Sequence, residues 1–385
     1  MHLAVLTGGG DVPGLNPAIQ SIVNEASIRG WQVTGFRRGW AGPLNFDPDD
    51  IHGSKDWIVP LSAETVWGID RTGGTILKTS RTKPSQTKKR DLPEFLKVNF
   101  LNHSDDEFVD ATTHVLTVFA SLNIDVLIAI GGDDTLSYAA HLHQKGLKTI
   151  CIPKTMDNDV FGTDYCIGFS TCVTRSVELI NRLRTPVGSH ERFLVVELFG
   201  RNCGYSALYA GYLAGADRTL ISEVPIDMEK LAKLLVQDRT KNKSNYAIVI
   251  VSEGASLIDQ EVLESGEADA YGHHKLGGIG QLVGSELKRL TGMNVMNQNL
   301  AYLLRAGAPD AVDLMVAKNF GSMAVRLIEE GRTGLMTVIK EGKYSTESAS
   351  IHITGERRVE VNAMYDEENY RPSIKQLDGM PMLLR

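Results

Sequence analysis

The sequence has 385 residues, of which 42% are hydrophobic and 23% are charged, as in globular proteins and unlike disordered chains. Its 47 acidic residues outnumber its 40 basic ones, and the net charge of -7 disfavours a general nucleic-acid-binding surface. The four cysteines form no Cys-x-x-Cys pair, no apolar run reaches a membrane span, and the N-terminus does not resemble a signal peptide. We therefore expect a cytoplasmic protein of two domains that binds neither nucleic acid nor membrane.

Five short apolar runs predict buried strands of a parallel sheet, with helical patterns between them. They cover residues 3–6, 126–130, 149–152, 193–198 and 247–251. After the first run, Asn16 and Pro17 form a favourable helix N-cap and first helical position, and another helical pattern follows Ser170. This alternation predicts an α/β protein whose ligands bind at the carboxyl ends of the strands.

Three stretches break the alternation. Residues 83–106 and 259–275 are polar and are predicted to be loops or insertions. Residues 351–355 and 358–361 have the composition of two short strands and predict a hairpin that packs against the protein. The second loop contains His273-His274, but two adjacent histidines without a third ligand are weak support for a metal site.

Two glycine-rich turns follow predicted strands. The turn at residues 8–14 precedes a helix, and its backbone amides could bind phosphate, although such turns also serve tight packing. The turn Gly-Gly-Asp-Asp-Thr at residues 131–135 brings Asp133 and Asp134 to a strand end, where carboxylates can hold Mg²⁺ between phosphate oxygens. The alternative is a structural role for Asp134 as the cap of the next helix.

The third strand leads into a loop that combines a cation with carboxylates, Pro-Lys-Thr-Met-Asp-Asn-Asp at residues 153–159. Such a loop can supply a general base, a metal-orienting carboxylate and a positive charge for a transferring phosphoryl group. Asn and Asp clusters also form ordinary turns. Three phosphate-compatible strand ends in one sheet nevertheless favour phosphoryl transfer.

Taken in this order, the motifs resemble those of the 6-phosphofructokinase family. The set begins with Gly-Gly-Asp-x-Pro-Gly-x-Asn at residues 9–16 and includes the two motifs at 131–135 and 153–159. Further matches are Gly-Gly-Thr at 73–75, Ser-His-Glu-Arg at 189–192, Glu-Leu-Phe-Gly-Arg-Asn-Cys-Gly at 197–204 and Ser-Glu-Gly at 252–254. The resemblance covers residues 2–335 and is specific as an ordered set.

The resemblance implies two α/β domains, each a Rossmann-like, parallel-sheet unit of three layers. A phosphoryl-donor domain is expected at residues 1–168 and about 304–350, and a sugar-phosphate domain at 169–303 and about 351–385. The implied reaction is Mg²⁺-dependent phosphoryl transfer to the 1-hydroxyl of fructose 6-phosphate. The family's active site lies at a subunit contact, so a homodimer or homotetramer is expected.

The resemblance also implies roles for the matched residues in the chemical step. Asp157 is the expected general base, with Thr155 and Asp159 beside it, and Asp133 is expected to hold Mg²⁺. Electrostatic positioning should supply most of the rate enhancement.

The matched cations and backbone groups imply binding roles. Arg81 and Arg201 would stabilise charge on the moving phosphoryl group, and the turn at Gly10 would present backbone amides to it. The remaining matches are expected to bind the sugar phosphate: Arg192 from the neighbouring subunit, Phe199, Gly200, Glu253, Tyr302 and Arg305.

Two positions bear on the phosphoryl donor. ATP-using members of the family have glycine where this chain has Asp134 and Lys154, whereas pyrophosphate-using members have Asp and Lys. An Asp side chain adds bulk and negative charge where a nucleotide's α-phosphate would lie, and Lys154 can neutralise compact pyrophosphate. The pair therefore favours pyrophosphate and a reversible reaction in glycolysis or gluconeogenesis; an Asp134–Lys154 ion pair without a selective role, and ATP as donor, are the alternatives.

The match fails at one segment. Met296 stands where the family has an arginine, and Tyr302 where it has a histidine, while Arg305 is kept. These departures affect the acceptor: fructose 6-phosphate is expected, with sedoheptulose 7-phosphate or another sugar phosphate as the alternative. They also leave open a non-catalytic, sugar-phosphate-binding regulatory subunit, although such a subunit would not need Asp133 and Asp157.

Overall fold

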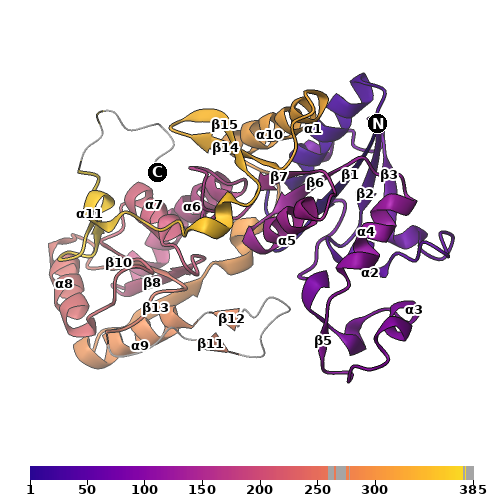
Figure 1. Ribbon diagram of the computed structural model, residues 1–385. Helices are drawn as coiled ribbons and strands as arrows, with labels where there is room; N and C mark the ends of the chain where they lie inside the picture. Colours follow the sequence, from indigo (N-terminus) through magenta and orange to yellow (C-terminus); the bar gives the residue numbers. More distant parts are fainter. Residues whose placement is uncertain (259–263, 266–274, 277, 376–377, 379–385) are drawn as a thin grey trace.

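The computed structural model describes residues 1–258, 264–265, 275–276, 278–375 and 378. Its larger sheet has seven strands: β1 His2–Thr7, β2 Gln32–Phe36, β3 Ile58–Leu61, β6 Val126–Gly131, β7 Thr149–Pro153, β14 Leu335–Lys340 and β15 Lys343–Ser348. The strand order is β15-β14-β7-β6-β1-β2-β3 (Figure 1). Neighbours from β14 to β2 are parallel, and the two edge strands are antiparallel to their neighbours.

Helices cover both faces of this sheet. They are α1 (Leu15–Ile28) and α10 (Ala311–Glu329) on one face, and α4 (Thr112–Ser121) and α5 (Asp133–Gln144) on the other. Alternate side chains of a strand point to opposite faces, so Leu3 and Val5 join the core with α1, whereas Ala4 and Leu6 join the core with α4. The sheet is therefore the buried middle of three layers.

The second sheet has four parallel strands from the middle of the chain: β8 Phe193–Leu198, β9 Arg218–Leu220, β10 Ala247–Ser252 and β13 Val295–Asn299. Their order is β13-β8-β10-β9. Helix α6 (Phe169–Ser189) packs on α7 (Tyr205–Ala214), and α8 (Met228–Lys241) packs on α9 (Ile279–Thr291). All five predicted strands are present, so the predicted α/β class is confirmed.

The chain returns to each sheet late in the sequence. After α10, strand β14 completes the first sheet, and the segment after β15 then runs to the second (Figure 1). There the N–H of Thr219 in β9 donates to the carbonyl of Tyr370 at 2.8 Å. The domain division expected from the sequence remains a proposal.

Two local predictions were wrong. Helix α1 begins at Leu15 after Gly14, and Asn16 is not its cap; its side-chain amide instead donates to Thr72 and Gly73, and its side-chain oxygen accepts from Ile76. The predicted C-terminal hairpin does not form. Residues 351–354 make a 3₁₀ turn, because His352 turns inward to bond Ser137 on α5 instead of pairing in a ladder.

The remaining described elements are short. Residues 83–111 are not a plain loop but carry β4, α3 and β5 around a small core of Leu92, Leu96 and Val109. Most of the predicted loop 259–275, with His273-His274, lies outside the described residues. None of the described helices is long and apolar enough to cross a membrane. The bounds are α2 Ala41–Asn45, α3 Glu94–Lys97, α11 Val361–Met364, β4 Thr87–Lys88, β5 Phe108–Val109, β11 Glu264–Ser265, β12 Lys275–Leu276, β16 Tyr365–Asp366 and β17 Arg371–Pro372.

Candidate active site

A polar pocket of about 220 Å³ lies where the carboxyl ends of β1, β6 and β7 face the turn after β8. Both sheets therefore contribute to it, as expected for parallel strands whose loops gather at one edge. The pocket is lined by Gly9, Gly10, Arg81, Gly132, Asp133, Asp134, Thr135, Lys154, Thr155, Asp157, Asp159, Arg201 and Asn202. The structure thus brings together all the residues predicted for the donor and the chemical step.

Gly9 and Gly10, in the turn after β1, line the pocket. The N–H of Gly8 donates to Ile130 at 3.0 Å and that of Gly9 donates to Ser80 at 3.1 Å. The N–H of Gly10 has no acceptor within the described part of the chain. A β-carbon at Gly10 would lie 3.3 Å from the guanidinium of Arg305, so the glycine allows this cation to approach the turn. The turn is thus free to bind an anion through an amide.

Lys154 brings a buried cation to the same turn. Its side chain is 3% exposed, and its Nζ donates to the carbonyl of Gly10 at 2.6 Å. The pKa of Lys154 is lowered to about 8. Burial is the largest cause and the positive charge of Arg305 the next, and the negative charge of Asp11 opposes them. The lysine remains charged at neutral pH, and its described hydrogen bond goes to a carbonyl rather than to Asp134.

The loop after β7 places two carboxylates side by side. Burial raises the pKa of Asp157 well above its usual range, and the negative charges of Asp159 and Glu253 raise it further. Asp157 Oδ2 accepts from the N–H of Arg201 at 3.4 Å, across the gap between the two sheets. Burial also raises the pKa of Asp159, which a hydrogen bond from Thr155 opposes. Burial and the neighbouring negative charges thus both favour the protonated form of Asp157.

Asp133 and Asp134 occupy the first turn of α5. The cap position belongs to Gly132, so Asp134 is not the helix cap considered as an alternative. Carboxylates in the first helical turn are favoured by the helix dipole, and both line the pocket. The described residues contain no group of three or more His, Cys, Asp or Glu side chains that could hold a metal by itself. This donor set fits Mg²⁺, which usually takes one or two carboxylates and completes its shell with water and phosphate oxygens.

The second sheet supplies a cluster centred on Arg305. Its guanidinium lies 4.9 Å from the ring centre of Phe199, 5.2 Å from that of Tyr302 and 3.7 Å from the carboxylate of Asp11. Tyr302 itself is 72% exposed. These aromatic contacts hold Arg305 in a fixed direction at the edge of the pocket.

Gly200 and Glu253 lie just after the carboxyl ends of β8 and β10. The carbonyl of Gly200 accepts from Ser252, Ser222 and the N–H of Gly254. With φ of 139° and Ser252 against its α-carbon, this position requires glycine. Burial raises the pKa of Glu253 to about 7, with the charge of Arg201 opposing.

Arg192 lies away from the pocket. It directly precedes β8, whereas Phe199 directly follows it, so the length of the strand, roughly 20 Å at ~3.3 Å per residue, separates them. In the sheet register, Met296 pairs with Leu194 and thus shares this amino end. Arg192 and Met296 therefore do not belong to the pocket of their own chain.

A model of the family described as phosphofructokinase matches residues 2–328. The chain belongs to the phosphofructokinase family. Family membership makes it an enzyme, a phosphotransferase.

Relatives within the phosphofructokinase family differ in their donor. A pyrophosphate–fructose 6-phosphate 1-phosphotransferase of Dictyoglomus thermophilum is 39% identical over 342 residues, covering 88% of this chain and 90% of that protein. An ATP-dependent 6-phosphofructokinase of Streptomyces coelicolor is 36% identical, covering 88% and 91%. The solved pyrophosphate-dependent phosphofructokinase of Nitrosospira multiformis superposes with a TM-score of 0.77 at 19% identity, covering 100% and 96%, and supports the fold. Phosphofructokinase membership alone does not assign the donor.

Several residues of this phosphofructokinase site were not functional candidates from the sequence, Asn202 and Asp11 among them. Asn202 lines the pocket, and its place within the motif at 197–204 was the signal that could have identified it. Asp11 faces Arg305 and lies in the first glycine-rich motif.

Proposed function

We propose that this chain transfers a phosphoryl group from pyrophosphate to the 1-hydroxyl of fructose 6-phosphate, giving fructose 1,6-bisphosphate and phosphate. The observation that carries the proposal is that Asp134 and Lys154 both line the pocket. The ammonium group of Lys154 is bound to the carbonyl of Gly10, in the turn that offers an amide to phosphate.

Electrostatics support this donor over ATP. Lys154 and Arg81 offer two positive charges to a compact anion that carries most of its charge on two adjacent phosphates. The carboxylate of Asp134 narrows the same pocket and repels a third phosphate. ATP is the second candidate donor, because the sequence identity to a relative named as ATP-dependent, 36%, is similar to the 39% identity to a relative named for pyrophosphate.

The chemical step needs a base and positive charge. In the proposed step, Asp157 takes the proton of the sugar 1-hydroxyl while that oxygen bonds to a phosphorus of pyrophosphate and the bond to the bridging oxygen breaks. Arg81, Arg201 and the amide of Gly10 would stabilise the equatorial oxygens, and phosphate leaves. Thr155 and Asp159 would keep Asp157 in its orientation, since Thr155 Oγ1 accepts from the N–H of Asp157 at 3.2 Å.

Asp133, with Asp134 beside it, would hold Mg²⁺. The bound ion would neutralise phosphate oxygens of the donor. Mg²⁺ usually binds through one or two carboxylates and takes water and substrate phosphate as its other ligands, so Asp133 and Asp134 would be enough to hold it.

The acceptor side rests on the second sheet. Glu253, Phe199 and Gly200 would contact the sugar, and Tyr302 and Arg305 its phosphate. Arg192 would enter from a second copy of the chain, because the strand separates it from its own pocket. The enzyme would then be a homodimer or homotetramer. Four buried free cysteines agree with the proposed cytoplasmic location.

A coupled assay tests the proposal. Purified protein is supplied with Mg²⁺, fructose 6-phosphate or sedoheptulose 7-phosphate, and either pyrophosphate or ATP. We expect turnover with pyrophosphate and fructose 6-phosphate in both directions. Turnover with ATP alone would overturn the donor, a preference for sedoheptulose 7-phosphate would overturn the acceptor, and no turnover would favour the regulatory subunit.

A further inference from the structure

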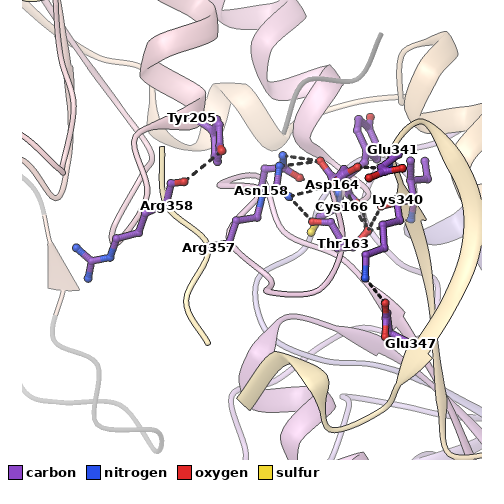
Figure 2. A network of polar contacts seen from close by, with 12 residues as sticks. Asn158, Thr163, Asp164, Cys166, Tyr205, Lys340, Glu341, Glu347, Arg357 and Arg358 are labelled. Carbon is purple, nitrogen blue, oxygen red and sulfur yellow. Dashed lines mark hydrogen bonds and ion pairs between the residues drawn. The ribbon is translucent and has the colours of Figure 1, made fainter. Parts of the chain in front are cut away.

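The residues 355–359, here called the strap, pass over the loops that carry the catalytic groups. The family model ends at residue 328, so the strap lies beyond the matched region. It has no helix or strand of its own, and its polar contacts are with the loop after β7 on one side and the start of α7 on the other. Figure 2 shows these contacts around Arg357 and Arg358.

The side chain of Arg357 is buried against the loop after β7. Its side chain is 10% exposed, and its two terminal nitrogens donate to the carbonyls of Thr163 and, at 2.9 Å, Asp164. The carboxylate of Asp164 lies 3.7 Å away and partly balances the charge. A guanidinium that binds two successive carbonyls fixes the course of the backbone between them.

This loop in turn holds Asn158, the residue between the two pocket carboxylates. The carbonyl of Asp164 also accepts from the amide of Asn158 at 3.1 Å, and the N–H of Cys166 donates to Asn158 Oδ1 at 2.8 Å. Asn158 has φ of 57°, in the left-handed region that a non-glycine residue keeps only when its surroundings hold it. The directions of Asp157 and Asp159 therefore depend on a hydrogen-bond network that includes Arg357.

The other side of the strap holds the turn that carries Arg201. The guanidinium of Arg357 lies 4.9 Å from the ring centre of Tyr205, whose hydroxyl donates to the carbonyl of Arg358 at 3.2 Å. Glu223 accepts from the N–H of Val359 at 2.9 Å and from that of Gly204 at 3.0 Å. Gly204 and Tyr205 lie three and four residues after Arg201, so the strap joins both halves of the pocket.

We propose that Arg357 is a positioning residue that fixes the separation between Asp157 and the Arg201 turn. It touches neither substrate site and acts through Asn158 and Tyr205. Two hydrogen bonds join these halves directly: the hydroxyl of Ser206 donates to the carbonyl of Met156 at 2.9 Å, and the N–H of Arg201 donates to Asp157 Oδ2 at 3.4 Å. The second bond is long, which leaves room for the distance between Asp157 and Arg201 to change. The inference rests on the proposed role of Asp157 as general base.

The test compares Arg357→Lys and Arg357→Met with Arg358→Met. Arg358 is the matched control, because it is next to Arg357 in the sequence, its own side chain is 52% exposed, and that side chain pairs only with Glu356 in the described structure. Lysine keeps the charge of Arg357 but cannot bind both carbonyls in the same fork. For the wild type and each variant, kcat, both KM values, the melting temperature and hydrogen exchange of residues 157–168 are measured.

We expect kcat to fall about 100-fold in Arg357→Met and about 10-fold in Arg357→Lys, since small displacements of catalytic groups are costly. Both KM values should change less than about threefold, because the positioned groups act mainly in the transition state. The melting temperature of Arg357→Lys should stay near that of the wild type, and exchange in its loop should rise. Arg358→Met should match the wild type.

Either of two results would overturn the role of Arg357. One is an Arg357→Lys enzyme with unchanged kcat and loop exchange. The other is a fall in kcat accompanied by a rise of similar factor in both KM values and by a clear drop in the melting temperature, because these changes together indicate a general structural role. If the wild type turns over neither donor, the proposed function fails, and unchanged loop exchange would then overturn the positioning role independently of activity.

Discussion

At the scale of single residues, the position of Lys154 decides the character of the donor pocket. Its ammonium group is almost fully buried, yet it is charged at neutral pH and lies among other cations, Arg81 and Arg305. The nearby carboxylates of Asp11 and Asp159 oppose that repulsion. A site of this kind is stabilised when a polyanion enters, because the anion is attracted by all three cations.

The donor assignment predicts the effect of a double substitution. Changing both Asp134 and Lys154 to glycine should lower kcat/KM for pyrophosphate about 100-fold, because two charge-dependent contacts are lost. It should also allow measurable use of ATP. The measurement is initial velocity with each donor at saturating fructose 6-phosphate.

The control for this prediction is the double variant Asp70→Ala with Lys318→Ala. It removes another Asp–Lys pair, 2.8 Å apart, that does not line the pocket. Its kinetics with both donors should match the wild type. Unaltered pyrophosphate kinetics in the glycine variant would show that the pair does not select the donor.

The shifted pKa values predict a bell-shaped pH profile of kcat/KM for pyrophosphate. Lys154, with its pKa lowered to about 8, is cationic below that pH and loses its charge above it, so activity should fall as the pH rises through about 8. On the acid side, Asp157 must be ionised to act as base. Because its pKa is raised, the rise in activity should begin well above the usual carboxylate range.

Lys154→Met identifies the group responsible for the alkaline fall. This variant should be slow at every pH and should show no decline near pH 8. A profile whose alkaline fall is the same in Lys154→Met and the wild type would assign that fall to another group.

At the scale of elements, one buried carboxylate joins the helices that flank the two sheets. Asp313, in the first turn of α10, accepts from Tyr165 Oη at 2.6 Å and Gly168 N–H at 2.7 Å, and from both the N–H and hydroxyl of Thr171. The last two donors lie at the start of α6, whose first turn needs acceptors. Asp313 thus fixes where α6 begins relative to α10.

Removing this carboxylate should destabilise the fold. Asp313→Ala leaves four buried donors unpaired, and we expect a loss of about 3–5 kcal/mol in the free energy of unfolding. Glu329→Ala, at the exposed end of the same helix, removes only a surface ion pair with Arg29 and should cost less than about 1 kcal/mol. Denaturant unfolding measures both, and similar losses in the two variants would contradict this account.

Local sequence predicted the buried strands well, because a short run of apolar residues is stable in a folded protein mainly when it is buried in the core. It failed where distant contacts decide conformation. Asn16 has the features of a helix cap, but its side chain binds a turn some 56 residues away in the sequence. Residues 351–354 have strand-forming composition, but the bond from His352 to Ser137 bends them.

The pocket residues were predictable because glycine, aspartate and lysine at strand ends form short local motifs. Arg357 was not, because nothing near it in the sequence distinguishes it from other arginines of the tail. Its role arises only from the carbonyls that it reaches across the fold.

At the scale of the whole molecule, the net charge of -7 hides a strong local excess of positive charge. Arg81, Lys154, Arg201 and Arg305 come from separate segments and gather at or beside one pocket. Arg192 is the exception, at the opposite end of β8. Met296 lies at that same end, so in the proposed oligomer its difference from the family pattern would alter a neighbouring copy's pocket rather than its own.

A shared active site predicts complementation between inactive variants. Asp157→Ala and Arg192→Ala should each be nearly inactive alone. When the two are dissociated, mixed and reassembled, half of the dimers should be hybrids with one intact site, giving about a quarter of wild-type activity. Activity no greater than the sum of the separate variants would show that Arg192 serves its own chain or none.

The late return of β14 to the first sheet has a consequence for synthesis. Strand β7 pairs with β14 through Ile150 and Cys151, but β14 is made after nearly the whole second sheet has left the ribosome. Until then β7 has an unpaired edge, which is a site for non-native pairing. The nascent chain must therefore protect that edge for about 180 residues of elongation, roughly 9–36 s at about 5–20 residues per second, and the second sheet can fold before the first is complete.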